Sequence, residues 1–210
     1  MDILKKSVLT LGITLGAMFC SFNADAQSGA EIQKAFKDSY ANEYKFNYKG
    51  AIADLQKFQA ESYETNIRLG WLTYMDKQYV VSMKYYQTAI DLKKFSIEAR
   101  LGYAGAAEGA KEFTKSYDKY EEILKIDPYN SFANYGVGLA YYTTKKYDVA
   151  AKYFELLINM YPFDYDANHM LGWTYLTLGK KAQSKILFEK ALLYKPGDPS
   201  SMDGFKKSIN

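Results

Sequence analysis

The amino-acid sequence predicts an all-α protein built as a solenoid of antiparallel helix pairs. The first observation is a repeat of 34 residues, which the prolines show most simply, because Pro128, Pro162 and Pro196 follow one another at that interval. The second is that residues of one type recur at the same interval from 63 to 198 without an insertion or deletion. The third is that apolar residues within each unit recur with the period of an α-helix. A fixed period of this length is typical of repeat architectures.

Three columns of the repeat can be described by residue type. A small residue in the first half of each unit occupies Gly70, Ala104, Gly138 and Gly172. In the second half, a small residue occupies Ser82, Ser116, Ala150 and Ser184, and an aromatic residue follows at Tyr86, Tyr120, Phe154 and Phe188. We expect the small residues to let two helices approach closely and the ring to fill the gap between neighbouring pairs. The columns indicate four units, at 63–96, 97–130, 131–164 and 165–198.

The unit at 131–164 shows how each helix begins and ends. Residues 132–143 repeat apolar side chains at helical spacing, a short Thr-Lys-Lys turn follows, and residues 147–160 form a second amphipathic run. Pro162 stops the second helix, because its ring removes a backbone donor and clashes with the preceding turn. Asp164 then places a carboxylate at the positive end of the next helix.

The residues on either side of the four units are expected to extend the array. Residues 27–62 are predicted to form a degenerate N-terminal helical pair, because residues 48–58 match residues 147–157 at a spacing of 99 instead of 102. The polar residues 199–210 are predicted to be the capping segment that solenoids need at their ends.

Residues 1–26 have the parts of a secretory signal peptide. A positively charged start precedes the apolar run 7–19, and Ala-Asp-Ala at 24–26 supplies the small residues that a signal peptidase reads. We therefore expect cleavage before Gln27 and an exported protein, periplasmic or secreted. One alternative is an uncleaved membrane anchor, for which the 18-residue uncharged run is short. The other is a lipid anchor at Cys20, which a bulky phenylalanine precedes where a small residue is usual.

The composition after cleavage limits the chemistry of the protein. Without Cys20 the chain has no cysteine, which excludes disulfides, iron–sulfur clusters and thiolate zinc sites. His169 is the only histidine, so we expect no multi-histidine metal site, and we predict no metal and no cofactor. Glu121 and Glu122 are adjacent and diverge on a helix, so no acid–base pair and no catalytic residue are predicted. A net charge of +3 does not argue for nucleic acid, and export argues against it.

Taken together, these columns resemble the tetratricopeptide repeat family, whose 34-residue helix–turn–helix unit carries the same small, aromatic and proline positions. The resemblance covers 63–198, with departures at Lys94, where proline is expected, and at Lys181, where the other units have an aromatic residue. It implies a right-handed superhelix in which the first helix of each pair lines a concave groove. One subset of the family grips acidic C-terminal tails with basic groove residues, but the equivalent face here is apolar and aromatic.

The motif Leu-Gly-Trp indicates which residues line the groove. It occurs at 69–71 and at 171–173, and its tryptophan column reads Trp, Gly, Leu, Trp along the four units. The fold does not require one residue type in a column that varies so much. If this column lay in the core, the unit with glycine would contain a cavity. We therefore expect both indoles to be accessible to solvent on the concave side. The predicted partner-binding groove comprises Trp71, Tyr74, Gly105, Tyr135, Tyr142, His169 and Trp173.

Three glycines lie in the middle of this groove. Gly102, Gly105 and Gly109 each cost about 1 kcal/mol in a helix interior. We interpret them as the floor of a hollow whose walls are aromatic rings. The alternative is that the rings simply pack on one another.

Lysines recur in the turn inside three of the units, at Lys77, Lys111 and Lys145. Solvated turns explain them best, and the alternative is contact with an anionic surface such as lipopolysaccharide or a membrane. Membrane contact is therefore expected to be peripheral at most.

These features predict a non-catalytic protein–protein interaction scaffold of the bacterial cell envelope. Its partner would be an extended or helical segment of another envelope protein, bound in the aromatic groove. A glycan or cell-wall fragment is the alternative ligand, because flat arrays of Trp and Tyr also stack on sugars.

Overall fold

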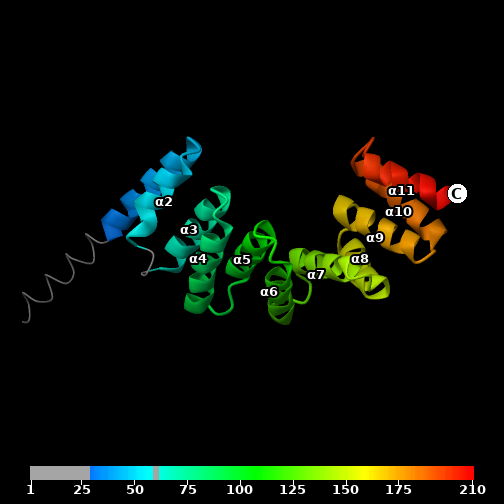
Figure 1. The fold of residues 1–210 in the computed structure, drawn as a ribbon, viewed down its shortest axis with the longest axis horizontal. Helices are drawn as coiled ribbons and strands as arrows, with labels where there is room; N and C mark the ends of the chain where they lie inside the picture. Colours follow the sequence, from blue (N-terminus) through cyan, green and yellow to red (C-terminus); the bar gives the residue numbers. More distant parts are fainter. Residues whose placement is uncertain (1–28, 59–61) are drawn as a thin grey trace, which may run out of the picture.

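The computed structural model describes residues 29–58 and 62–210. The predicted signal peptide, its cleavage site and Cys20 lie outside the described residues. Within the described part, α-helices joined by turns form an elongated, curved array without a strand, which confirms the predicted all-α solenoid (Figure 1). Each helix runs antiparallel to the next and packs against it.

The helices come in consecutive pairs. A helix over residues 29–44 precedes α2 (Tyr48–Gln56). The next four pairs are α3 (Tyr63–Met75) with α4 (Tyr79–Leu92), α5 (Ile97–Gly109) with α6 (Phe113–Ile126), α7 (Ser131–Thr143) with α8 (Tyr147–Met160), and α9 (Tyr165–Thr177) with α10 (Lys181–Tyr194). The last helix, α11 (Pro199–Ile209), packs on α9 and α10. From α3 to α9, the first helix of each pair begins 34 residues after the previous one.

The start of each first helix is fixed by one polar residue. Its side-chain oxygen accepts a hydrogen bond from the backbone N–H three positions later, which satisfies one of the donors that a helix start leaves free. The capping residues recur every 34 positions, at Ser62, Ser96, Asn130, Asp164 and Asp198. A side-chain cap of this kind is worth about 1 kcal/mol. The repeat in the sequence therefore sets the phase of the helices.

The turns inside the units carry the recurrent lysines. Lys77, Lys111 and Lys145 have φ angles of 60°, 62° and 62°, and the equivalent residue of the last unit, Gly179, has a φ angle of 77°. This is the left-handed region, in which one residue reverses the chain between two helices. The lysine side chains are exposed, so the column belongs to the turn geometry.

The core is built around the aromatic residue of each second helix. Phe154 and Phe188 are fully buried. A Cβ atom added to Gly138 would lie 2.8 Å from the Phe154 ring, and one added to Gly172 would lie 3.0 Å from the Phe188 ring. A small residue is thus required where the first helix of a pair approaches the ring of its own second helix, and in the second unit alanine, Ala104, meets this requirement.

A second glycine column, which the sequence analysis did not recognise, contacts the same rings from the next pair. Gly102 faces Tyr86, Gly136 faces Tyr120 and Gly204 faces Phe188, all too closely for a Cβ atom. Each of these rings is therefore held between its own pair and the following one. The sequence signal was available, because these glycines are spaced by multiples of 34.

The interpretation of the three middle glycines as one open floor is wrong for two of them. Gly102 is covered by the ring of Tyr86, and a Cβ atom at Gly109 would lie 2.6 Å from the Tyr79 ring. Only Gly105 faces open space, with nothing within 4 Å of an added Cβ atom. The glycines at 102 and 109 are needed for packing, because rings from the preceding pair reach across to them.

Candidate partner-binding groove

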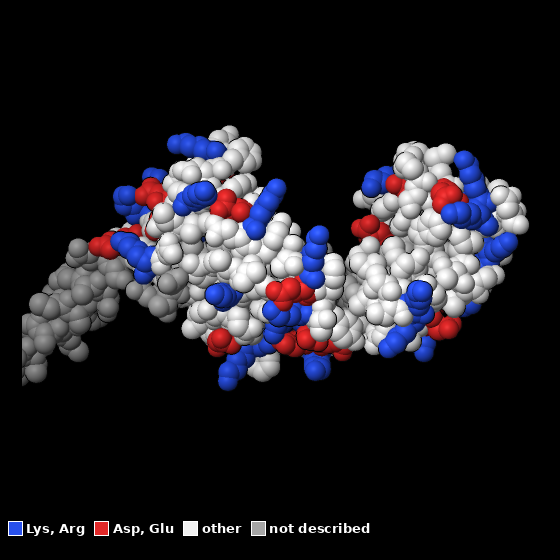
Figure 2. Space-filling model, viewed as in Figure 1, with Lys and Arg blue, Asp and Glu red and all other residues white. Residues whose placement is uncertain are grey.

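The surface of the solenoid is hollowed above its middle, between the part that holds α3–α6 and the part that holds α9–α11 (Figure 2). The residues predicted to line the concave groove are all on the first helices of the pairs, α3, α5, α7 and α9. They do not form one continuous aromatic wall. Among the described residues, ring contacts gather them into separate groups at the two ends and in the middle.

The N-terminal group is centred on Trp71, whose side chain is 42% exposed, as expected. Its indole stacks on Tyr74 with 6.1 Å between ring centroids, and Tyr74 in turn contacts Tyr79. The indole Nε1–H donates a hydrogen bond of 2.7 Å to Glu43 at the end of the helix over residues 29–44. Arg68 also pairs with Glu43, at 2.6 Å. Trp71 is therefore turned toward the N-terminal end of the array.

The carboxylate of Glu43 is stabilised in its charged form. Burial raises its pKa, but the hydrogen bond from Trp71 and the hydrogen bond and charge of Arg68 outweigh burial and hold the pKa below its ordinary value. Glu43 thus remains charged at neutral pH and fixes the position of the indole.

The space that Trp71 leaves open is a pocket of about 560 Å³ on the groove side. Five aromatic rings line it, from Phe36, Tyr40, Tyr63, Trp71 and Tyr86. Three charged residues complete the lining, Glu64, Arg68 and Glu98, together with Ile67. We call it the Trp71 pocket. Sequence reasoning placed Trp71 in the groove but missed the contribution of the helix at 29–44.

The C-terminal group contains His169 and Trp173. Their rings contact each other and the buried Phe188, and the indole Nε1–H donates a hydrogen bond of 3.2 Å to Ser200. The ammonium group of Lys207 lies 5.4 Å from the centre of the indole. Trp173 is therefore half-buried, which differs from the expectation of an accessible indole, because Ser200 and Lys207 of α11 lie against it.

The predicted residues in the middle of the groove also pack locally. Tyr135 lies against Phe154 with 5.9 Å between ring centroids, and burial raises its pKa to about 12. Tyr142 contacts Tyr147 at 5.3 Å. Gly105, by contrast, faces open space. The alternative that rings pack on one another thus holds in the middle of the array.

The single histidine offers a test of the C-terminal group. Burial lowers the pKa of His169, against the charges of Asp198 and Asp166, which favour the protonated form. The unfolded chain therefore binds a proton more readily than the folded chain. The lowered pKa of His169 therefore makes the free energy of unfolding depend on pH. Its full value is present above about pH 6.5, the ordinary pKa of histidine, and the protein loses stability as the pH falls below that value.

We expect the NMR titration midpoint of His169 to lie below about 6.5, the ordinary histidine value. The melting temperature should also decline from about pH 6.5 downward more steeply in the wild type than in a His169→Gln variant. A midpoint above that value would contradict the burial of the ring under α11.

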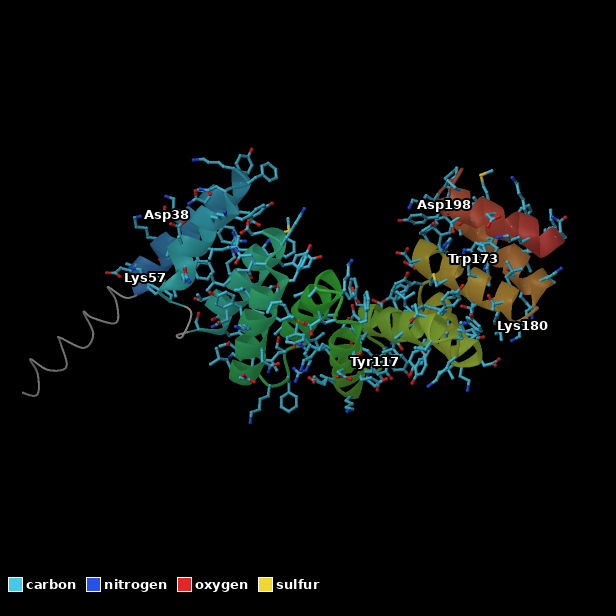
Figure 3. All side chains as sticks on the ribbon, in the orientation of Figure 1. Asp38, Lys57, Tyr117, Trp173, Lys180 and Asp198 are labelled. Carbon is cyan, nitrogen blue, oxygen red and sulfur yellow. The ribbon has the colours of Figure 1, made fainter. Side chains whose placement is uncertain are left out.

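A second pocket, of about 580 Å³, lies between α6 and α7 and was not predicted. It opens beside Phe113, which is 65% exposed. In the neighbouring units, the residue equivalent to Phe113 packs on a tyrosine, Tyr74 or Tyr142. In the unit that contains Phe113, Glu108 occupies the position of that tyrosine. Its carboxylate accepts hydrogen bonds from Ser116 and Tyr120 instead of packing on Phe113. The pocket thus follows from one substitution within the repeat. Tyr117, which lines it, lies at the lower edge of the solenoid in Figure 3.

The described residues contain no group of three or more His, Cys, Asp or Glu side chains arranged to hold a metal ion. In the same part of the chain, none of the helices has the length and apolar character needed to cross a bilayer.

Comparisons with known proteins agree with the fold. A model of the tetratricopeptide repeat matches residues 133–164 and 165–198. No curated protein matches the chain. Among solved structures, the MamA protein has a TM-score of 0.69 at 21% identity, over 79% of this chain and 92% of that one.

Two further structures are similar to the chain. A tetratricopeptide repeat protein from Parabacteroides merdae has a TM-score of 0.74 at 18% identity, over 86% of this chain and 73% of that one. YrrB, described as a tetratricopeptide repeat protein with an unusual peptide-binding site, has a TM-score of 0.67 at 11% identity, over 82% and 90% of the two chains. Residues 133–198 match the tetratricopeptide repeat, and the chain shares the solenoid fold of these structures, in agreement with the columns of the sequence.

Proposed function

We propose that the protein is a non-catalytic scaffold of the bacterial cell envelope that binds a segment of another protein along the concave side of its solenoid. The observation that carries the proposal is Trp71, an indole 42% exposed at the mouth of a pocket of about 560 Å³. Exposed aromatic side chains beside a well-formed pocket are the usual anchors of protein interfaces. The tetratricopeptide repeat fold supports the class of function, and the signal-like residues 1–26 support export.

The groove suits a segment of chain better than a folded surface. The hollow runs along several pairs, and the accessible groups are separated along it, with Trp71 near one end and the open space at Gly105 further along. A segment could meet these points in succession, and its side chains would supply the specificity.

The experiment compares three forms of the purified protein as bait in an envelope extract: wild type, Trp71→Ala and Leu193→Ala. Leu193 is 71% exposed on α10, a second helix, and serves as the matched control. Trp71→Ala should change the free energy of unfolding by less than about 1 kcal/mol, because the side chain is only partly buried. It should weaken binding of a partner by about 2 kcal/mol or more if the indole is an anchor.

Partners retained by the wild type are then purified and titrated against each variant by calorimetry. The proposal requires binding to be lost with Trp71→Ala and kept with Leu193→Ala. Equal binding by wild type and Trp71→Ala, or loss with Leu193→Ala alone, would contradict a groove centred on Trp71.

A glycan remains the second candidate because the rings of Trp71 and Tyr74 form a nearly flat platform. Their planes differ by 25° and their centroids are 6.1 Å apart. The same three forms titrated with soluble cell-wall fragments distinguish the two ligands, since only a glycan site should respond to fragments that carry no protein.

A further inference from the structure

We propose that the Trp71 pocket receives a basic side chain, lysine or arginine, from the bound segment. This rests on the proposed function and adds the chemistry of the partner. The first and last units of the repeat place equivalent residues in two different environments.

The last unit shows how a cation sits on this surface. The ammonium of Lys195 lies 4.6 Å from the centre of the Tyr165 ring, and that of Lys207 lies 5.4 Å from the indole of Trp173. Both distances fall within the range of cation–π attraction, which is strongest over tryptophan. The protein thus covers these two ring positions with its own cations.

The first unit has the same two rings, but the position equivalent to Lys207 is empty. Tyr63 and Trp71 occur 102 residues before Tyr165 and Trp173, and Gly105 occurs 102 residues before Lys207. A Cβ atom added to Gly105 would meet nothing within 4 Å. The chain therefore keeps the indole but has no lysine at the position equivalent to Lys207, and the cation of the pocket, Arg68, lies instead over the Tyr40 ring, 3.9 Å from its centre.

The charges around the pocket favour a cation from outside. Glu64 and Glu98 line it, and both are exposed. The hydroxyl of Tyr63 donates a hydrogen bond of 2.8 Å to Glu98, which holds that carboxylate beside the rings. Neither carboxylate pairs with a lysine or arginine in the described part of the chain. The one cation in the lining, Arg68, is already paired with Glu43, so the pocket retains negative charge.

Two further differences between the first and last units also favour a cation in the Trp71 pocket. Ser200, which accepts the Trp173 hydrogen bond, is equivalent to Glu98, so an uncharged acceptor in the last unit is a carboxylate in the first. Trp71 is turned toward Glu43 instead of toward the following helix, and the pocket that it lines also reaches the edge of the buried Tyr86. A side chain with a long apolar stem and a charged end fits such a site, because the stem contacts the rings and the charge meets the carboxylates.

The test selects ligands from a displayed library of random dodecapeptides with the purified protein. Three forms are compared: wild type, the double variant Glu64→Gln/Glu98→Gln, and the control Glu189→Gln, which removes an exposed carboxylate on α10. The net charge of the protein is +3, so basic peptides are not attracted by overall charge. Peptides selected by the wild type and by the control should be enriched in lysine or arginine at one position, and the double variant should lose this enrichment.

The affinity of a selected peptide is measured through the fluorescence of Trp71 in a Trp173→Phe background. The double variant should weaken binding about tenfold, and replacing the selected basic residue with norleucine should do the same. Peptides that need Trp71 but show no basic enrichment would overturn this inference and leave the proposed function standing. If no peptide binds, both fall. Acidic enrichment, or equal affinity of the double variant, would also overturn the inference.

Discussion

Replacing Phe154 with alanine is expected to lower the free energy of unfolding by about 3–5 kcal/mol. The ring is fully buried, contacts Tyr135, and lies in a cluster of small and apolar residues from α8, α9 and α10. Its removal would leave a cavity that rigid helices on both sides cannot close. Because each pair of a solenoid is stabilised by its neighbours, the loss should spread to the adjacent units.

Chemical denaturation followed by circular dichroism measures this effect, with Phe163→Ala as the matched control. Phe163 is 57% exposed in the turn before α9, and its ring lies 5.4 Å from that of the exposed Tyr194. Its replacement should cost less than about 1 kcal/mol. Equal losses in the two variants would show that the aromatic column does not carry the core.

Replacing Gly138 with leucine is expected to destabilise the protein strongly. The Cβ atom alone would lie 2.8 Å from the buried ring of Phe154, and the rest of the side chain has no space to occupy. Overpacking of this kind costs about 1–3 kcal/mol or more.

The same replacement at Gly105 provides the control. Open space surrounds an added Cβ atom there, and leucine is the better helix former by nearly 1 kcal/mol. Gly105→Leu should therefore leave the melting temperature unchanged or raise it, whereas Gly138→Leu should lower it strongly. If both variants were destabilised alike, the assignment of Gly105 to the open groove would fail.

Most of the fold could be predicted from the sequence because its period is fixed by local chemistry. The residues 132–143 and 147–160 were predicted as helices, and α7 and α8 cover Ser131–Thr143 and Tyr147–Met160. The proline after the second helix and the capping residue before the next first helix act within one turn of chain. Such signals are visible in a single unit.

Contacts between units were harder to predict. Gly102 and Gly109 were assigned to an open floor, but rings of the preceding pair cover both. The half-burial of Trp173 likewise depends on α11, whose packing is not implied by the residues around the tryptophan. In each case the decisive neighbour is 20 or more residues away in sequence or belongs to another unit.

The site was predicted in part for the same reason. Trp71 and Gly105 are accessible, as their variable column indicated, whereas Trp173 of the same column is half-buried. The pocket beside Trp71 also needs Phe36 and Tyr40 from the N-terminal helix, where the repeat is too degenerate to align. The pocket beside Phe113 follows from Glu108, which becomes visible only when the tyrosine column is compared across units.

The central claim, that a partner segment lies on the concave side at Trp71, is tested most directly by the fluorescence of that indole. In a Trp173→Phe background Trp71 is the only tryptophan. Titration with a bound segment should shift and saturate its emission, with the same dissociation constant that calorimetry gives. Calorimetric binding of that segment without any change in the emission of Trp71, and with equal affinity for Trp71→Ala, would contradict the account.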